Sequence, residues 1–411
     1  MTRSRILFLA EDRHGATGAG LRNRVLLEAL GRRYDLTAIS MAEVAGDMAP
    51  RPRAGSGRFR FLDPKPVWAR RFDAADRRRW RAALERRIDD LAPHLAIVSH
   101  ATALSWLDAP LSVPTILDAY DLLWVARRRQ LETGASGGGG LRSVARRWRV
   151  GVEVTLARRY ELAAMHRVDR AWVCSDLDRR LLLDRGYRRP VAVVPNTVAA
   201  AGDPRGDFGD RGGVVLFVGT LGYHANRDGV SWFLRRVWPG VLRRRPSARF
   251  VVVGKRPEWW TPGGEFRQDG VELRGFVDDL EPIWVEADLL VCPLRVGSGT
   301  RLKILEAWSR GVPVVSTPVG IEGLGHADGR EASVAASPAV LTDRLVEVLG
   351  SEEQRERLGR GGHERWRGCY APQHAETVIQ QDCERALGAA NERARDPKGR
   401  TDDGGTADKV G

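Results

Sequence analysis

Two cations and a carboxylate follow a short glycine-rich segment in the second half of the chain. Arg301, Lys303 and Glu306 come directly after residues 297–300, which read Gly-Ser-Gly-Thr. Apolar residues at helical spacing begin at Leu302, so the segment is expected to be a loop that leads into a helix. The unpaired N–H groups of a helix start, with two cations beside them, suit a phosphate. A carboxylate one turn further on can accept hydrogen bonds from two ribose hydroxyls, so the pattern indicates a nucleotide diphosphate site.

Two predicted strands enclose this loop and helix. Residues 287–293 and 314–317 are apolar runs of strand length, and Gly311 separates the helix from the second run. We expect Ser298 or Thr300 to cap the helix, because serine and threonine are favoured at that position. A plainer interpretation stays open, in which Lys303 and Glu306 are an ordinary helix-surface pair and the glycines are simple turn residues.

Residues 297–324, GSGTRLKILEAWSRGVPVVSTPVGIEGL, resemble the donor-binding segment of the family 4 retaining glycosyltransferases, which have the GT-B fold. That family usually carries two glutamates eight residues apart. Glu306 matches the second of them, whereas Ser298 stands where the first would be. The resemblance implies that backbone amides of residues 298–300 replace the first glutamate. It covers roughly residues 1–385 and is strongest over 271–325.

The order of elements and the resemblance agree on the fold class. Strands alternate with helices along the chain, which favours parallel sheets covered by helices. The resemblance implies an α/β GT-B architecture, in which two Rossmann-like parallel-sheet domains face each other across a cleft. The first, acceptor-side domain is expected over 1–205 and the donor-binding domain over 206–370. A helix at about 371–388 is expected to complete the first domain, and 389–411 to be a disordered tail.

The resemblance also assigns the donor site. The first loop of the second domain, at Gly219 and Thr220, faces the phosphates in that family, and Phe276 and Val277 border the nucleobase. The expected donor-binding residues are Gly219, Thr220, Arg227, Lys255, Phe276, Val277, Gly297, Ser298, Gly299, Thr300, Leu302 and Glu322. Arg301, Lys303 and Glu306 are the expected catalytic residues.

Candidates for the acceptor and sugar side lie where strands of the first domain end. His100 directly follows one apolar strand, and Asp118 and Tyr120 follow another. Ligands of open parallel sheets bind beyond the carboxyl ends of the strands. Gly15 and Gly18 lie between the first strand and its helix, as in the first loop of GT-B transferases. Tyr120 departs from many relatives, which carry a histidine there, and a role for these residues in loops and caps alone stays open.

Composition limits the partners. The formal net charge is +13, and the basic residues are almost all arginine. Such charge attracts phosphate donors or anionic membrane surfaces, whereas no nucleic-acid motif accompanies it. Residues 141–166 form a basic helix with Trp148 and Val152, for which a solvated surface is the simpler interpretation and membrane contact the alternative. No run approaches membrane-span length, and we expect a cytoplasmic protein, with peripheral contact at the inner membrane face as the alternative.

The sequence thus predicts a metal-independent retaining transferase of the hexosyltransferase type. A nucleotide-diphosphate sugar would be the donor substrate, and a lipid-linked sugar, polysaccharide or small molecule would supply the acceptor hydroxyl. No cofactor is expected, and no Asp-x-Asp pair stands at a strand end to suggest a metal. Cell-surface polysaccharide, glycolipid or secondary-metabolite glycoside synthesis is the expected setting. A sugar-nucleotide epimerase of the same fold and a non-catalytic sugar-nucleotide binding protein remain alternatives.

Overall fold

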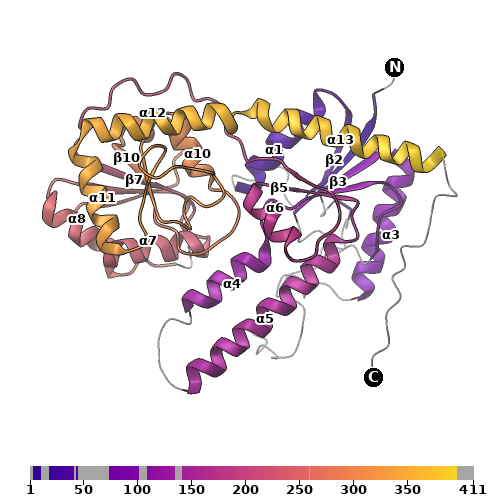
Figure 1. Ribbon diagram of the computed structural model, residues 1–411, viewed down its shortest axis with the longest axis horizontal. Helices are drawn as coiled ribbons and strands as arrows, with labels where there is room; N and C mark the ends of the chain where they lie inside the picture. Colours follow the sequence, from indigo (N-terminus) through magenta and orange to yellow (C-terminus); the bar gives the residue numbers. More distant parts are fainter. Residues whose placement is uncertain are drawn as a thin grey trace.

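The computed structural model describes residues 3–10, 18–40, 43–44, 74–100, 109–134, 141–258 and 260–395. The chain builds two six-stranded sheets with helices packed against them (Figure 1). The strand pairs in both sheets are parallel. The predicted α/β fold with two Rossmann-like parallel-sheet domains is therefore confirmed. We call the parts built on the two sheets the first and second domain.

The first sheet has the strand order β2-β1-β3-β4-β5-β6. Its strands are β1 (Arg5–Ala10), β2 (Asp35–Ser40), β3 (Leu95–Ser99), β4 (Thr115–Asp118), β5 (Arg170–Val173) and β6 (Val191–Val193). Separate apolar clusters cover its two faces. Burial on both faces explains why inner strands such as β1 and β3 are almost continuous apolar runs rather than alternating ones.

The helices of the first domain are α1 (Gly18–Gly31), α3 (Ala74–Leu91), α4 (Leu123–Gly134), α5 (Leu141–Met165) and α6 (Asp176–Leu183). Helices α4 and α5 run side by side and extend away from the first sheet (Figure 1). The sequence analysis did not predict α4. Its start is fixed from a distance, because the buried Glu161 carboxylate of α5 accepts the N–H groups of Leu123 and Trp124 at 3.1 and 2.9 Å.

The second sheet has the order β12-β11-β10-β7-β8-β9. Its strands are β7 (Val214–Val218), β8 (Arg249–Val253), β9 (Val271–Gly275), β10 (Leu289–Cys292), β11 (Val314–Ser316) and β12 (Ser333–Val334). One large apolar cluster joins this sheet to its helices. The order changes direction between β7 and β10, and in open sheets ligands bind beyond the strand ends at such a point.

The helices of the second domain include α7 (His224–Arg236), α8 (Trp238–Arg244), α9 (Glu281–Glu286), α10 (Leu302–Ser309), α11 (Pro338–Gly350) and α12 (Glu352–Cys369), with a 3₁₀ turn over Gly264–Arg267. The sequence pattern over 230–242 predicts one continuous helix, but the structure has two helices here. They meet at Val237, and Pro239 lies in the first turn of the second. A proline fits a first turn but not a helix interior, so the chain begins a new helix there.

The last helix, α13 (Pro372–Arg395), crosses back to the first domain and packs beside α1 (Figure 1). Its buried Asp382 accepts hydrogen bonds from Arg170 and from the Trp172 indole at 2.5 and 2.8 Å. The helix runs seven residues past the expected end at 388, so a disordered tail beginning at 389 is wrong for residues 389–395. Alanine and arginine favour helix there despite the polar character that suggested disorder. The rest of the tail lies outside the described residues.

Three other predictions involve residues that are not described. The candidate Gly15 and a strand predicted over 58–62 lie outside the described residues. Of a flexible glycine run predicted over 132–140, residues 132–134 belong to α4 and the rest lie outside the described residues.

Candidate functional site

The glycine loop 297–300 connects β10 to α10, as expected, but its hydroxyls do not cap the helix. Arg301 occupies the cap position, with no side-chain hydrogen bond to the helix start. The Ser298 hydroxyl donates instead to the Asp121 carboxylate and to the Leu122 carbonyl. Thr300 accepts a hydrogen bond from Asn196 at 2.8 Å. The predicted cap by Ser298 or Thr300 is therefore wrong, because contacts from the first domain bind both hydroxyls.

Arg301 places a buried guanidinium beside this loop. The residue is only 8% exposed, and its Nη1 donates to the Ser298 carbonyl. Its Nε and Nη2 have no hydrogen-bond partner among the described residues. Burying unpaired charged donors is costly unless an anion meets them. The arrangement is therefore suited to an anionic ligand.

Lys303 lies in the first turn of α10, and its side chain contacts β7 and the start of α7. Its Nζ donates to Asn226 at 3.1 Å and lies 3.9 Å from the centre of the Phe217 ring. A Cβ atom on Gly219 would come within 2.7 Å of this amine, so only glycine leaves room for it. Burial lowers the pKa of Lys303 to about 8, and the nearby Arg301 charge acts in the same direction. A bound anion would favour the charged form of the amine.

Glu306 lies one turn along α10, half-buried. Burial raises the pKa of its carboxyl, although Arg310 and Lys303 act against that shift. In the described part of the chain no hydrogen bond reaches this carboxylate, and Lys303 bonds Asn226 instead. Glu306 is therefore an acceptor that a ligand with hydroxyl groups would satisfy.

The other residues predicted for the donor side follow strands β7 to β9. The Thr220 hydroxyl donates to the Lys255 carbonyl at 3.1 Å, which joins the loops after β7 and β8. Arg227 donates to two carbonyls of its own loop at 2.8 and 2.9 Å, so it braces that loop. Phe276 follows β9 and is 61% exposed, with Val277 beside it. An exposed aromatic ring at a strand end offers a flat apolar surface.

Glu322 lies on the loop after β11 and pairs with an arginine of the first domain. The Arg129 Nη2 on α4 is 2.6 Å from its carboxylate, and the Arg129 Nη1 donates to the Gly297 carbonyl at 2.6 Å. The Tyr223 hydroxyl also lies near Gly297, since a Cβ there would be 3.4 Å from it. Glu322 therefore joins the ring of contacts around the glycine loop.

Two contacts place three of the predicted acceptor-side residues. A Cβ on Gly18 would meet the Leu302 side chain at 3.5 Å, so the start of α1 lies next to α10. The His100 and Tyr120 rings have centroids 4.8 Å apart. The backbone of His100 has a φ of 80°, a conformation that residues other than glycine rarely adopt. Residues in such a conformation are often found at functional sites.

Asp118 is placed differently from the other candidates. It is fully buried and forms a bidentate ion pair with Arg22, with a closest distance of 2.5 Å. The same guanidinium donates to the Asn196 side chain at 2.9 Å. Asp118 therefore acts within the first domain, as a partner of Arg22, rather than on its surface.

Sequence reasoning missed several side chains at this site. Arg129 stands in a run of three arginines, and nothing in the run marks it out from Arg127 or Arg128. Asn196 follows a proline near the expected end of the first domain and carried no assigned role. Asp178, whose pKa burial raises to about 6, lies near the Arg301 charge. Only the polar start of its helix marked it in the sequence.

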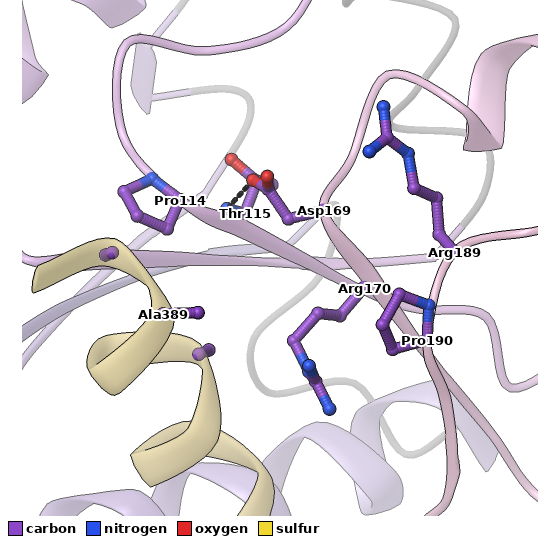
Figure 2. Close-up of a pocket in the computed structure, with 9 residues that line it drawn as sticks. Pro114, Thr115, Asp169, Arg170, Arg189, Pro190 and Ala389 are labelled. Atoms are coloured by element: carbon purple, nitrogen blue, oxygen red, sulfur yellow. Dashed lines mark hydrogen bonds between the residues drawn. The ribbon is translucent and has the colours of Figure 1, made fainter. Parts of the chain in front are cut away.

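A small cavity of about 80 Å³ lies elsewhere, where α13 crosses the first sheet (Figure 2). Asp169 lies beside Thr115 and accepts its N–H at 2.9 Å, with Arg170, Arg189 and Pro190 nearby (Figure 2). Thr115 and Arg170 are the first residues of their strands, so this cavity lies at the amino-terminal ends of the strands. His100 lies at the opposite, carboxyl-terminal ends. The cavity is separate from the glycine loop.

Among the described helices, none combines the length and apolar character needed to cross a membrane.

Comparison with known proteins identifies the second domain. Residues 212–351 match the family model described as glycosyl transferases group 1. A curated relative, an uncharacterized 44.6 kDa protein in the cps region of Klebsiella pneumoniae, is 26% identical over 141 residues. The match spans 32% of this chain and 36% of that protein, about a third of each.

Solved structures share the whole architecture. Sucrose-phosphate synthase from Thermosynechococcus elongatus superposes with a TM-score of 0.68 at 16% identity, over 94% of this chain and all of that one. Anabaena HepE in complex with UDP gives 0.56 at 14% identity, over 93% and 100% of the two chains. WaaG, a glycosyltransferase involved in lipopolysaccharide biosynthesis, gives 0.55 at 14%, over 91% and 99%. The chain therefore has the GT-B fold, and its second domain matches the family model of the glycosyl transferases group 1.

Proposed function

We propose that the protein is a retaining glycosyltransferase. It moves a sugar from a nucleotide-diphosphate sugar to a hydroxyl acceptor. The observation that carries this proposal is the Arg301 guanidinium, buried at the start of α10 with two unpaired N–H donors, inside a glycosyl transferases group 1 domain. A diphosphate is an anion that would satisfy both donors.

The proposed donor lies across the ends of β7, β9 and β10. Its phosphates meet Arg301, Lys303 and the N–H groups of the glycine loop and the α10 start. Glu306 accepts hydrogen bonds from the ribose hydroxyls, and the base lies by Phe276 and Val277. The structural neighbour HepE was solved in complex with UDP, so a uridine nucleotide is the first candidate.

The transfer step needs stabilisation of a departing phosphate. The bond from the sugar C1 to the phosphate oxygen breaks, and the acceptor oxygen bonds to C1 from the same face. The acceptor hydroxyl gives its proton to the leaving phosphate, so configuration is retained and charge balances. Arg301 and Lys303 stabilise the negative charge that develops. Because two cations and a helix start supply this charge, we propose that transfer of a hexose needs no metal ion.

The acceptor binds from the first domain, beside His100, Tyr120 and Gly18. Its hydroxyl belongs to a lipid-linked sugar, a polysaccharide or a small molecule, consistent with synthesis of surface polysaccharide, glycolipid or a glycoside. We also propose peripheral contact with an anionic membrane through α5. On that helix Trp148 is 72% exposed and Val152 39% exposed, and arginines flank them.

Replacement of Arg301 tests the proposal. Removing one charge-stabilising donor costs about 2.7–4 kcal/mol of transition-state stabilisation, so Arg301→Ala should lower kcat about 100- to 1,000-fold. Arg330→Ala, at an exposed position of the same domain, serves as the control. The assay follows release of nucleoside diphosphate and formation of a glycoside from a panel of nucleotide sugars.

An altered free sugar without a glycoside would point to an epimerase, and binding without turnover to a silent binding protein. Wild-type kcat in Arg301→Ala would remove the phosphate assignment, and loss of activity in EDTA would remove the metal-free one.

A further inference from the structure

We infer that three side chains of the first domain, Arg129, Asp121 and Asn196, are positioning residues that hold the glycine loop of the donor site in shape. The inference rests on the proposed function for its ligand. It goes further by placing part of the donor site's support in the opposite domain.

Each residue of the loop meets the first domain. The Gly297 carbonyl accepts from Arg129 at 2.6 Å, and the Ser298 hydroxyl bonds Asp121. Thr300 accepts from Asn196 at 2.8 Å. At Gly299, a Cβ atom would lie 2.8 Å from the Tyr120 carbonyl. The loop is therefore enclosed along its full length by groups of the opposite domain.

The residues of the loop themselves give it little rigidity. Gly297 and Gly299 have φ values of 112° and 70°, a region that glycine adopts without steric strain. Fixing a glycine in one conformation costs more backbone entropy than fixing any other residue. The helix that follows has no side-chain cap. Local sequence alone would therefore leave this loop with many conformations.

The loop in turn fixes the proposed phosphate ligand. The Arg301 Nη1 donates to the Ser298 carbonyl, which orients the guanidinium that has two unpaired donors. A shift of the loop would move this carbonyl and the guanidinium with it. Affinity for a diphosphate should therefore depend on contacts made by residues that do not touch it.

Arg129 connects two loops of the second domain. It bonds the Gly297 carbonyl and Glu322 with its two terminal nitrogens, so one side chain joins the loops after β10 and β11. Asn196 extends the network inward, because its amide oxygen accepts from Arg22, which pairs with Asp118. The loop is thus connected to the buried core of the first domain.

The neighbouring Arg128 provides a matched control. It lies on the same helix and pairs with Glu132 at 2.8 Å, with both side chains about half exposed. Arg128→Ala removes the same charge from α4 without touching the loop. A difference between the two variants therefore reports the loop contact rather than net charge.

The first experiment needs no ligand. Hydrogen exchange of the full-length protein is followed in peptides that cover the glycine loop and, as an internal reference, strand β10. In Arg129→Ala the loop should exchange at least about fivefold faster than in wild type and in Arg128→Ala, with β10 unchanged. Equal loop exchange in the three proteins would overturn the inference. So would equal acceleration of the loop and β10, because that indicates general loosening.

The second experiment measures the dissociation constant of UDP by calorimetry, with ADP, GDP and dTDP as further probes. Arg129→Ala should weaken the best-binding nucleotide about tenfold, and Arg129→Lys should recover part of the loss. The donor KM should rise more than kcat falls. Absence of nucleotide binding in wild type would reject the proposed function while the exchange result still judges the loop. Unchanged affinity in Arg129→Ala would reject the positioning role.

Discussion

Lys303 keeps its charge in a partly apolar place, against the Phe217 ring and the Gly219 backbone. Because burial lowers its pKa to about 8, a rise in pH above that value should neutralise the amine of the empty protein. Affinity for UDP should therefore fall severalfold between pH 7 and pH 9. Lys303→Arg should show a flatter profile, since arginine stays charged. Calorimetry across this range measures it, and parallel profiles for both proteins would contradict a role for the Lys303 charge.

The same pKa makes a statement about stability. The folded value lies below the ordinary lysine value of 10.5, so the unfolded chain binds more protons between the two. The contribution of Lys303 to the free energy of unfolding should rise as pH increases from about 8 toward that ordinary value. Lys303 is thus a charge kept at a cost in the empty protein, as expected for a ligand-binding group.

Glu306 is, like Lys303, a titratable group whose charged form is disfavoured by burial, but its charge is negative. Its carboxyl has a raised pKa through burial, so the charged form is disfavoured in the empty protein. Glu306→Gln keeps the shape and removes the charge. Hydrogen bonds to charged groups contribute about 1.5–3 kcal/mol against 0.5–1.5 for neutral ones, so UDP affinity should fall roughly five- to fiftyfold.

The melting temperature without ligand should stay the same or rise slightly in Glu306→Gln, because a half-buried charge is removed. Thermal melting with calorimetry separates the two effects. Equal UDP affinity in both proteins would make Glu306 a helix-surface residue only.

At the residue scale, the sequence grouped the candidate side chains of the second domain but not the residues that contact them. Arg301, Lys303 and Glu306 follow one another on a single helix, so local spacing was enough to group them. Their roles as ligands stay predictions. Asp121 and Asn196 reach the loop from 177 and 104 residues away in the chain, and no local pattern carries such pairings.

Among the elements, α4 and α5 are the pair that departs most from a simple layered domain (Figure 1). Arg129 in the middle of α4 contacts the donor loop, whereas Trp148 lies exposed on α5. If α5 meets a membrane, Trp148→Ala should lower binding to vesicles of phosphatidylglycerol and phosphatidylcholine about fivefold, since aromatic rings favour the interface. Vesicle co-sedimentation at low and physiological salt measures this.

Tyr160→Ala is the wrong control for that test, because Tyr160 is half-buried and interacts with its surroundings. Val340→Ala is better suited, since Val340 is 46% exposed on α11 of the second domain. Equal vesicle binding by Trp148→Ala and wild type would leave α5 as a solvated basic helix, which is the simpler interpretation of its sequence.

Most elements could be predicted because both sheets are parallel and buried. Apolar runs such as those at β1, β3 and β10 stand out from polar loops, and their spacing gives the helices between them. Two errors have tertiary causes. The Ser298 hydroxyl was drawn away from the helix start by Asp121, and α4 begins on a carboxylate that lies on α5.

At the scale of the whole molecule, the chain crosses between domains more than once. Residues 194–213 carry it from the first domain to the second, and α13 brings it back. The core of the first domain therefore includes side chains of α13, which comes last among the helices described. The resemblance to GT-B transferases, rather than hydrophobic periodicity, predicted that this helix returns to the first domain.

This dependence predicts a large effect from one residue of α13. Asp382 is 1% exposed and pairs with Arg170 and Trp172 of β5. Asp382→Ala leaves a partly buried cation and an indole N–H unpaired, so the free energy of unfolding should fall by about 3 kcal/mol. Glu384→Ala, two residues away, breaks only an ion pair whose side chains are about half exposed, and should cost less than about 1 kcal/mol. Urea denaturation followed by tryptophan fluorescence compares them. If Asp382→Ala were as stable as Glu384→Ala, α13 would be a loosely attached end rather than part of the first domain's core.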